Sequence, residues 1–208
     1  MNICGVIVAL PEVVTMIKDL VLTGAAGTTA WVAWTGLRKW REELGGKAEF
    51  ETARELAHAT YTLRDLLRSA RSPWYPAAEF PAGYDGLKSS PQEEAEAWAH
   101  IYQQRITPVL VAVTQFENKA LQAEALWGQE SRTKTDALVS CVQSLWIAME
   151  AVVSDKRERG ENFKSDDGFG KNMRARVNGK PNGTDELSIE VKAAVDAIEQ
   201  QLKPHLRR

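Results

Sequence analysis

An uncharged run near the N-terminus most constrains what this chain can fold into. Residues 20–37 read LVLTGAAGTTAWVAWTGL, with Lys18-Asp19 before them and Arg38-Lys39-Trp40-Arg41 after them. At about 1.5 Å of rise per residue, a helix of this length is close to what is needed to cross a hydrocarbon core of roughly 30 Å. A helix in water normally carries a polar face over such a length. The run therefore predicts a transmembrane helix over 19–41.

The same run is less apolar than a leucine-rich span, because it contains three glycines and four threonines. A helix buried in a soluble bundle, or at an oligomer interface, is the alternative. Small residues also let spanning helices approach closely, and Gly24 and Thr28 have the small-xxx-small spacing. We therefore expect a homo-oligomer. The residues predicted for the span and for self-association are Gly24, Gly27, Thr28, Trp31 and Trp34.

The cations around the run predict its orientation. Lys18 is the cation close to its N-terminal side, whereas Arg38, Lys39 and Arg41 follow it. The positive-inside rule then places segment 1–18 outside and the C-terminal domain, 42–208, in the cytoplasm. The first residues lack the positive n-region of a signal peptide. The prediction is a single-pass protein in contact with membrane lipid.

The rest of the chain predicts an all-α fold. Apolar residues recur every three or four positions in several segments, which is the period of amphipathic helices. The segment 157–184 is rich in glycine, asparagine and charge and is predicted to be a mobile loop, with a short helix over 169–177. An antiparallel bundle of about four helices is the simplest arrangement. The predicted helices cover 47–71, 90–127 (with Ser90 as N-cap and a kink at Pro108), 131–156 and a last segment from Thr184 to Pro204.

Composition and motifs argue against several function classes. The net charge of −2 gives no basic face for nucleic acid. Cys4 and Cys141 are too far apart in sequence to suggest a disulfide framework or a metal pair. Glu55 and His58 form one E-x-x-H pair, but a helical di-iron site needs a second pair and two more glutamates. The run 166–172 fails as a phosphate loop and as a calcium loop. We therefore predict no catalytic residue, metal or cofactor, and a non-enzymatic protein.

Four arginines lie along one face of the helix predicted over 47–71. Guanidinium groups in such a row suit a phosphorylated ligand, an anionic headgroup or an acidic protein partner. The alternative, which we favour, is a solvated face paired with the glutamates at 93, 94 and 96. The candidate contact residues are Arg54, Arg64, Arg68 and Arg71.

The connection from Trp74 to Ser90 is long and rich in aromatic residues. A loop of this length in a compact domain is usually functional or packed on itself. Its aromatic residues either cap the hydrophobic end of the bundle, which we favour, or form a docking surface for a partner. They are Trp74, Tyr75, Phe80 and Tyr84.

Three segments, AWVAWTGLRKWREEL, FETARELAHATYTLRDLLRSARSP and AIEQQLKPHLRR, resemble a set of uncharacterised short bacterial proteins. In these proteins an N-terminal membrane helix leads into a cytoplasmic helical domain. The resemblance implies a bacterial inner-membrane protein with this topology, and it supplies no activity.

We expect an oligomerising sensor, scaffold or membrane effector of the bacterial defence or toxin type. The alternative is a soluble helical-bundle module that binds proteins, with 20–37 buried in its core or at an oligomer interface.

Overall fold

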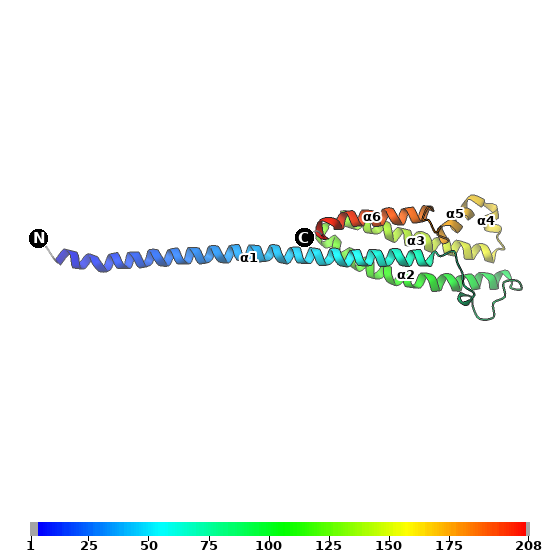
Figure 1. Cartoon of the computed structure of the whole chain (residues 1–208), viewed down its shortest axis with the longest axis horizontal. Coiled ribbons are helices and arrows are strands. Elements are labelled where there is room, and N and C mark those ends of the chain that lie inside the picture. Colours follow the sequence, from blue (N-terminus) through cyan, green and yellow to red (C-terminus); the bar gives the residue numbers. More distant parts are fainter. Residues whose placement is uncertain (1–3, 207–208) are drawn as a thin grey trace. The chain divides into compact units, whose positions relative to one another are not determined.

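The computed structural model describes the backbone of residues 4–206 and the side chains of residues 18, 28–29, 31–41 and 43–206. Within that part of the chain every regular element is helical, which confirms the all-α prediction. The elements are α1 (Cys4–Ala70), a short 3-10 helix (Ala77–Glu79), α2 (Pro91–Trp127), α3 (Gln129–Arg157), α4 (Glu161–Ser165), α5 (Asp167–Val177) and α6 (Glu186–Leu206) (Figure 1).

The contacts divide the chain into two compact units, 1–48 and 49–208. From Cys4 onward the first unit is helical, and Gly45 and Gly46, which could have interrupted the helix, are both part of it. The second unit contains the last turns of α1 and all later elements.

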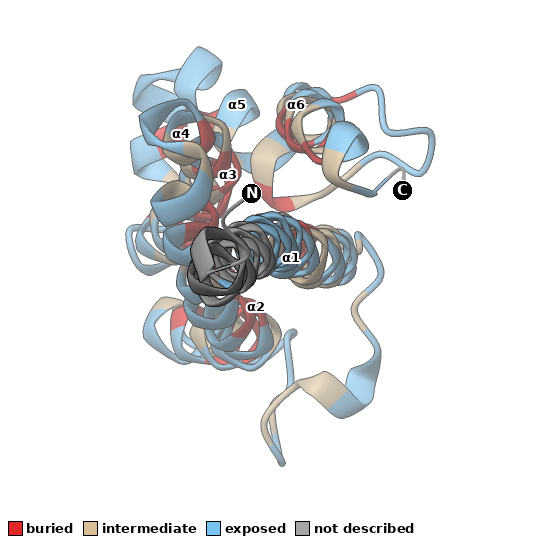
Figure 2. Ribbon diagram, turned by 90° about the vertical axis from the view of Figure 1, so that its left-hand side faces the viewer, coloured by how far each residue is buried: buried red, intermediate tan, exposed pale blue. Residues whose placement is uncertain are grey.

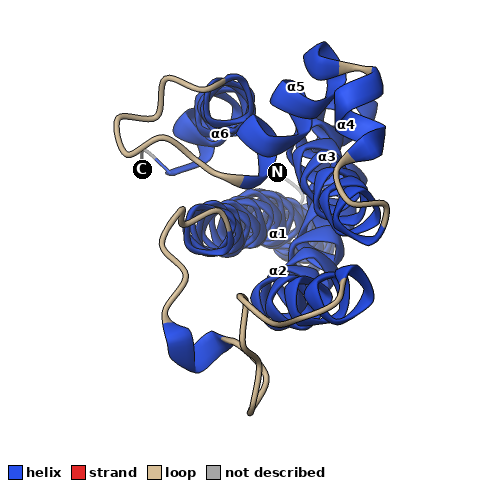
Figure 3. Ribbon diagram, turned by 90° about the vertical axis from the view of Figure 1, so that its right-hand side faces the viewer, coloured by secondary structure: helices blue, strands red, loops and turns tan. Residues whose placement is uncertain are grey.

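In the second unit four long helices form the bundle that the sequence predicts. The last turns of α1 lie beside α2, α3 and α6, and the chain direction alternates from one helix to the next (Figures 1 and 3). Helix α3 contacts α2 and α6, and the short helices α4 and α5 pack against it. The result is an antiparallel helical bundle with a two-helix addition.

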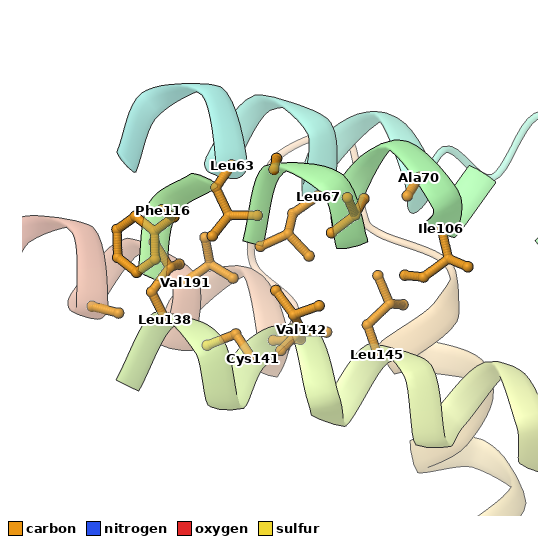
Figure 4. Close-up of a cluster of buried hydrophobic side chains, with 14 of the residues drawn as sticks. Leu63, Leu67, Ala70, Ile106, Phe116, Leu138, Cys141, Val142, Leu145 and Val191 are labelled. Atoms are coloured by element: carbon orange, nitrogen blue, oxygen red, sulfur yellow. The ribbon is translucent and has the colours of Figure 1, made fainter. Parts of the chain in front are cut away.

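One hydrophobic core runs through this bundle. Apolar side chains from α1, α2, α3 and α6 point toward one another in it (Figure 4), and the buried positions lie on the inner sides of the helices (Figure 2). Phe116, Leu138 and Leu145 are among the fully buried ones. Removing such a side chain from water contributes about 1.5–3 kcal/mol each, so this cluster supplies the main driving force for the fold.

Local signals set the ends of α2. The Ser90 hydroxyl accepts a hydrogen bond from the Glu93 amide, and the Glu93 carboxylate accepts one from the Ser90 amide, which completes a capping box. Gly128 ends the helix with φ of 77°, a conformation that costs little only in glycine, and α3 begins at the next residue. Pro108 lies inside α2, and the helix continues through it. Pro204 likewise lies inside α6, so the prediction that it ends the last helix is wrong.

The segment over 157–184, predicted as a mobile loop with a short helix over 169–177, contains two helices, and the second of them, α5, includes the predicted one. Asp166 caps α5 by accepting a hydrogen bond from the Phe169 amide at 2.9 Å. Phe163 of α4 and Val177 of α5 are buried. A Cβ at Gly170 would lie 2.6 Å from the Cβ of Phe163, so the glycine permits this packing. A polar, glycine-rich sequence is thus ordered by a few buried contacts with α3.

The N-terminal transmembrane helix predicted over 19–41 is not supported by the described residues. Within them, the helix long and apolar enough to cross a membrane is α3, near the middle of the chain. Its most apolar 18-residue window has a mean hydropathy of 1.6, and 39% of that window is buried in the structure. Since α3 packs against α2, α5 and α6, a core position accounts for much of this hydropathy.

Candidate functional site

The four arginines proposed as an anion or partner contact do not act as one surface. Arg54 forms an ion pair with Glu51 at 2.8 Å, and Arg64 pairs with the adjacent Asp65 at 2.9 Å. Arg68 is exposed, whereas Arg71 is buried. None of the described ion pairs joins these arginines to the glutamates at the start of α2. Glu94 pairs with Lys156 instead. Arg54 and Arg68 are exposed and Arg64 is half-buried, whereas Arg71 must be removed from the set.

Arg71 binds three parts of the bundle at once. It follows the end of α1, and its guanidinium donates to the carbonyls of Arg176 at 2.7 Å and Ala175 at 3.2 Å, in the last turn of α5. It also donates to the Ser188 hydroxyl at 2.8 Å and forms an ion pair with Asp185. Every partner of this guanidinium belongs to the chain itself, so Arg71 stabilises the bundle and is not available to a ligand.

Asp185 is the acidic partner in this buried pair. Burial alone would raise the pKa of its carboxyl group, but the hydrogen bonds that it accepts from Arg71, Ser188 and the Lys180 amide outweigh burial and hold the pKa far below its usual range. The Ser188 amide donates to Asp185 at 3.0 Å, which caps the start of α6. The carboxylate is therefore fixed in its charged form.

The aromatic connection is packed against the start of α2. The Tyr75 and Trp98 rings meet edge-to-face at 4.8 Å, and Phe80 meets Trp98 at 5.8 Å and stacks on Tyr84 at 5.1 Å. Trp74 differs, because 77% of its surface is exposed. Three of the four predicted residues thus form one aromatic cluster with Trp98, as the capping interpretation expects.

Arg105 of α2 fixes this connection in place, and the sequence reasoning missed it. Its guanidinium pairs with Glu79 at 2.8 Å and donates to the carbonyls of Ser72 at 2.6 Å and Trp74 at 2.5 Å. It also lies 4.2 Å from the centre of the Tyr75 ring, a cation–π distance. The available signal was a lone arginine in an otherwise nearly uncharged stretch of α2, which indicates a cation used inside the fold.

An open cavity of about 490 Å³ lies between residues 81–89 and the start of α2. Its polar lining mixes signs: Asp85 pairs with Lys88 at 3.5 Å, Glu93 belongs to the capping box, and His100 lies 2.9 Å from Gln104. No three His, Cys, Asp or Glu side chains of the described residues are placed to hold a metal ion.

Other reactive groups are also engaged in structure. Glu55 of the E-x-x-H pair binds Lys119 at 2.7 Å, and His58 is exposed. Burial raises the pKa of the Cys141 thiol to about 11, so the reactive thiolate is scarce at neutral pH. These groups give the described part of the bundle no activated nucleophile.

The first unit carries the residues predicted for the span. Thr28 is exposed, Trp31 and Trp34 are 69% and 66% exposed, and Gly24 and Gly27 lie outside the residues whose surroundings are described. Further large apolar side chains follow on the same helix with little cover: Val32, Leu37, Trp40 and Leu44. Arg38, Lys39 and Arg41 are exposed among them. This stretch combines uncovered aromatic surface with cations.

Comparisons of the chain with protein-family models, with curated proteins and with solved structures find no match.

Proposed function

We propose that this protein is a membrane-anchored, non-enzymatic helical protein in which residues 19–41 cross a bilayer and the bundle lies in the cytoplasm. Its role would be that of a scaffold, sensor or effector that assembles at the bacterial inner membrane through the small residues of its anchor.

The observation that carries the proposal is the exposed aromatic and basic stretch after the uncharged run. Trp31 and Trp34 are about two-thirds exposed, and leaving large apolar side chains in water forfeits about 25 cal/mol for each Å² of apolar surface. Tryptophan is favoured where a helix meets lipid headgroups, and arginine and lysine are favoured on the cytoplasmic side. A bilayer would cover the tryptophans and bind the cations that follow.

The composition of the bundle core supports the anchor over the soluble alternative. The buried hydrophobic cluster of the described residues begins at Ala53 and ends at Leu202, so all its members come from the second unit. Within segment 20–37, the side chains that the structure describes, 28–29 and 31–37, are exposed. The engaged state of Glu55 and Cys141 supports a non-enzymatic role.

Membrane fractionation of the full chain tests the proposal. The protein should sediment with membranes and stay there through alkaline carbonate extraction, whereas a chain that starts at Lys47 should be soluble and give the far-UV circular dichroism of a folded helical protein. Recovery of the full chain in the soluble fraction without detergent would refute the anchor. An aggregated or unfolded product from the shortened chain would favour the alternative, in which 20–37 completes the fold.

A further inference from the structure

The end of the bundle at Glu49 holds a histidine in contact with an acid and an indole ring. Glu49 is the first residue of the second unit, and its carboxylate lies 3.2 Å from Nδ1 of His205. The imidazole also stacks on the Trp127 ring, with ring centres 4.4 Å apart and planes 22° from parallel. The His205 side chain is 23% exposed, so these contacts are partly shielded from water. One imidazole thus connects α6 with α1 and α2.

Three features around this imidazole favour its protonated form. A positive charge on the ring turns the contact with Glu49 into a charge-assisted pair. The π face of Trp127 attracts a cation that lies over it. His205 is also in the last turn of α6, where the helix dipole favours positive charge. Between about pH 5 and pH 8 histidine changes its charge while glutamate stays ionised, so acidification strengthens all three contacts.

The other charged groups at this end of the four long helices do not reverse that preference. Glu124 of α2, one turn before Trp127, is half-buried and adds negative charge. Lys203 of α6 is exposed, so water and salt screen its repulsion. The remaining charged groups of α1 and α3 at this end form ion pairs of their own: Glu51 with Arg54, Glu130 with Lys134, and Arg132 with Asp136.

The same end contains polar atoms that the fold leaves unsatisfied. Among the described residues, Nε1 of Trp127 and Oγ of Ser131 are buried without a hydrogen-bond partner. Both residues lie within three positions of Gly128, where α2 passes into α3. Burial of a polar atom without a partner opposes closure of the structure around it. The contacts of His205 therefore matter more here than a similar pair would beside a fully satisfied core.

We infer that His205 makes a pH-sensitive contact that holds the end of α6 against Glu49 and Trp127. Protonation of the imidazole tightens the contact, and deprotonation loosens it. Helix ends open locally with a smaller free energy than the core does, so the effect should appear as local opening of the last turns of α6. The inference does not depend on the membrane anchor, because all three residues belong to the second unit.

Hydrogen exchange of the full chain in mild detergent tests the inference. The readout is the protection factor of the backbone amides in the last turns of α6, since this factor removes the intrinsic effect of pH on exchange. An exposed ion pair changes an equilibrium by a factor of about 1.5–5, and here the indole face adds to it. The ratio of protection at about pH 5.5 to protection at about pH 8 should be at least about threefold larger in the wild type than in His205→Phe.

The variants separate this contact from general effects of pH. His205→Phe keeps a ring to stack on Trp127 and removes the group that takes up the proton. His100→Gln is the matched control, because His100 is exposed and lies 2.9 Å from Gln104 of its own helix, and it should keep the wild-type ratio. Glu49→Gln retains the imidazole without its anionic partner and should lower the ratio.

Three results would overturn the inference. One is an equal ratio in the wild type and His205→Phe. Another is a fall in His100→Gln as large as that in His205→Phe, which would assign the effect to histidine titration in general. The third is an unchanged ratio in Glu49→Gln, and this variant decides the question if His205→Phe does not fold.

Discussion

Replacing Arg71 with alanine should destabilise the bundle more than any exposed substitution in α1. The guanidinium is buried, and it connects the end of α1 with the end of α5 and the start of α6 through four hydrogen-bonding partners. Arg71→Ala leaves the Asp185 carboxylate buried without its cation and the carbonyls of Ala175 and Arg176 without their donor.

The magnitude follows from these contacts. Removal of one member of a buried ion pair costs about 3–5 kcal/mol, because the remaining charge stays out of water without compensation. The Ser188 and Lys180 donors to Asp185 survive the substitution, which favours the lower half of that range. Against a total stability of about 5–15 kcal/mol for a domain, this loss is large.

Urea unfolding of the full chain in mild detergent, followed by circular dichroism, measures the loss. Arg68→Ala is the matched control: Arg68 is exposed three residues earlier, and its removal should change the free energy of unfolding by less than about 0.5 kcal/mol. An Arg71→Met, Asp185→Leu double variant should lose less than the sum of the two single losses, since neither buried charge is left alone. Unfolding of Arg71→Ala and Arg68→Ala at the same urea concentration would show that the buried pair adds no stability.

The same pair predicts a dependence on pH. The native contacts lower the pKa of Asp185 relative to an unfolded aspartate, whose pKa is about 3.9. A carboxyl group whose pKa is lowered by folding contributes its full stabilisation at any pH above its unfolded pKa. This contribution falls as the pH drops toward the native pKa. The free energy of unfolding of the wild type should therefore exceed that of Asp185→Asn by a constant amount above about pH 5. This difference should shrink below about pH 4. A difference that grows on acidification would contradict a lowered pKa for Asp185.

Three further predictions concern local features. Ser90→Ala removes half of the capping box with Glu93 and should cost about 1 kcal/mol in urea unfolding, with no change in the slope against urea. Gly170→Ala should cost about 1–3 kcal/mol, because the new methyl group would meet the Phe163 ring and force α4 and α5 apart; faster hydrogen exchange confined to these two helices would check it. Cys141 should react with a thiol reagent at pH 8 at least about tenfold more slowly in the native than in the urea-unfolded protein, because burial raises its pKa.

Features encoded by neighbouring residues could be predicted from the sequence. The start of α2 follows from Ser90 and Glu93, whose side chains bond each other's backbone across one turn. The chain reversal at Gly128 uses a positive φ, which glycine adopts at little cost. The aromatic cap was also foreseeable, because Tyr75 and Phe80 lie close in sequence to the end of the bundle that they cover.

Features that depend on distant partners could not be predicted in the same way. Arg71 has the helical spacing of Arg64 and Arg68, but α1 ends at Ala70, and the guanidinium turns inward to a carboxylate 114 residues later in the chain. Helix α4 depends on Asp155 of α3, which accepts a hydrogen bond from the Phe163 amide at 2.8 Å. Neither contact produces a periodic pattern in the sequence near Arg71 or Phe163.

The uncovered apolar surface of the first unit contrasts with the closed end of the bundle. At its N-terminal limit the bundle is closed by its own residues: His205 lies 3.2 Å from Glu49 and stacks on Trp127 with ring centres 4.4 Å apart. Large exposed apolar side chains nevertheless gather before residue 45, in the first unit: Trp31, Val32, Trp34, Leu37, Trp40 and Leu44. The cations Arg38, Lys39 and Arg41 are exposed among them. A bilayer would suit this set, because tryptophan is favoured at lipid headgroups and arginine and lysine are favoured on the cytoplasmic side.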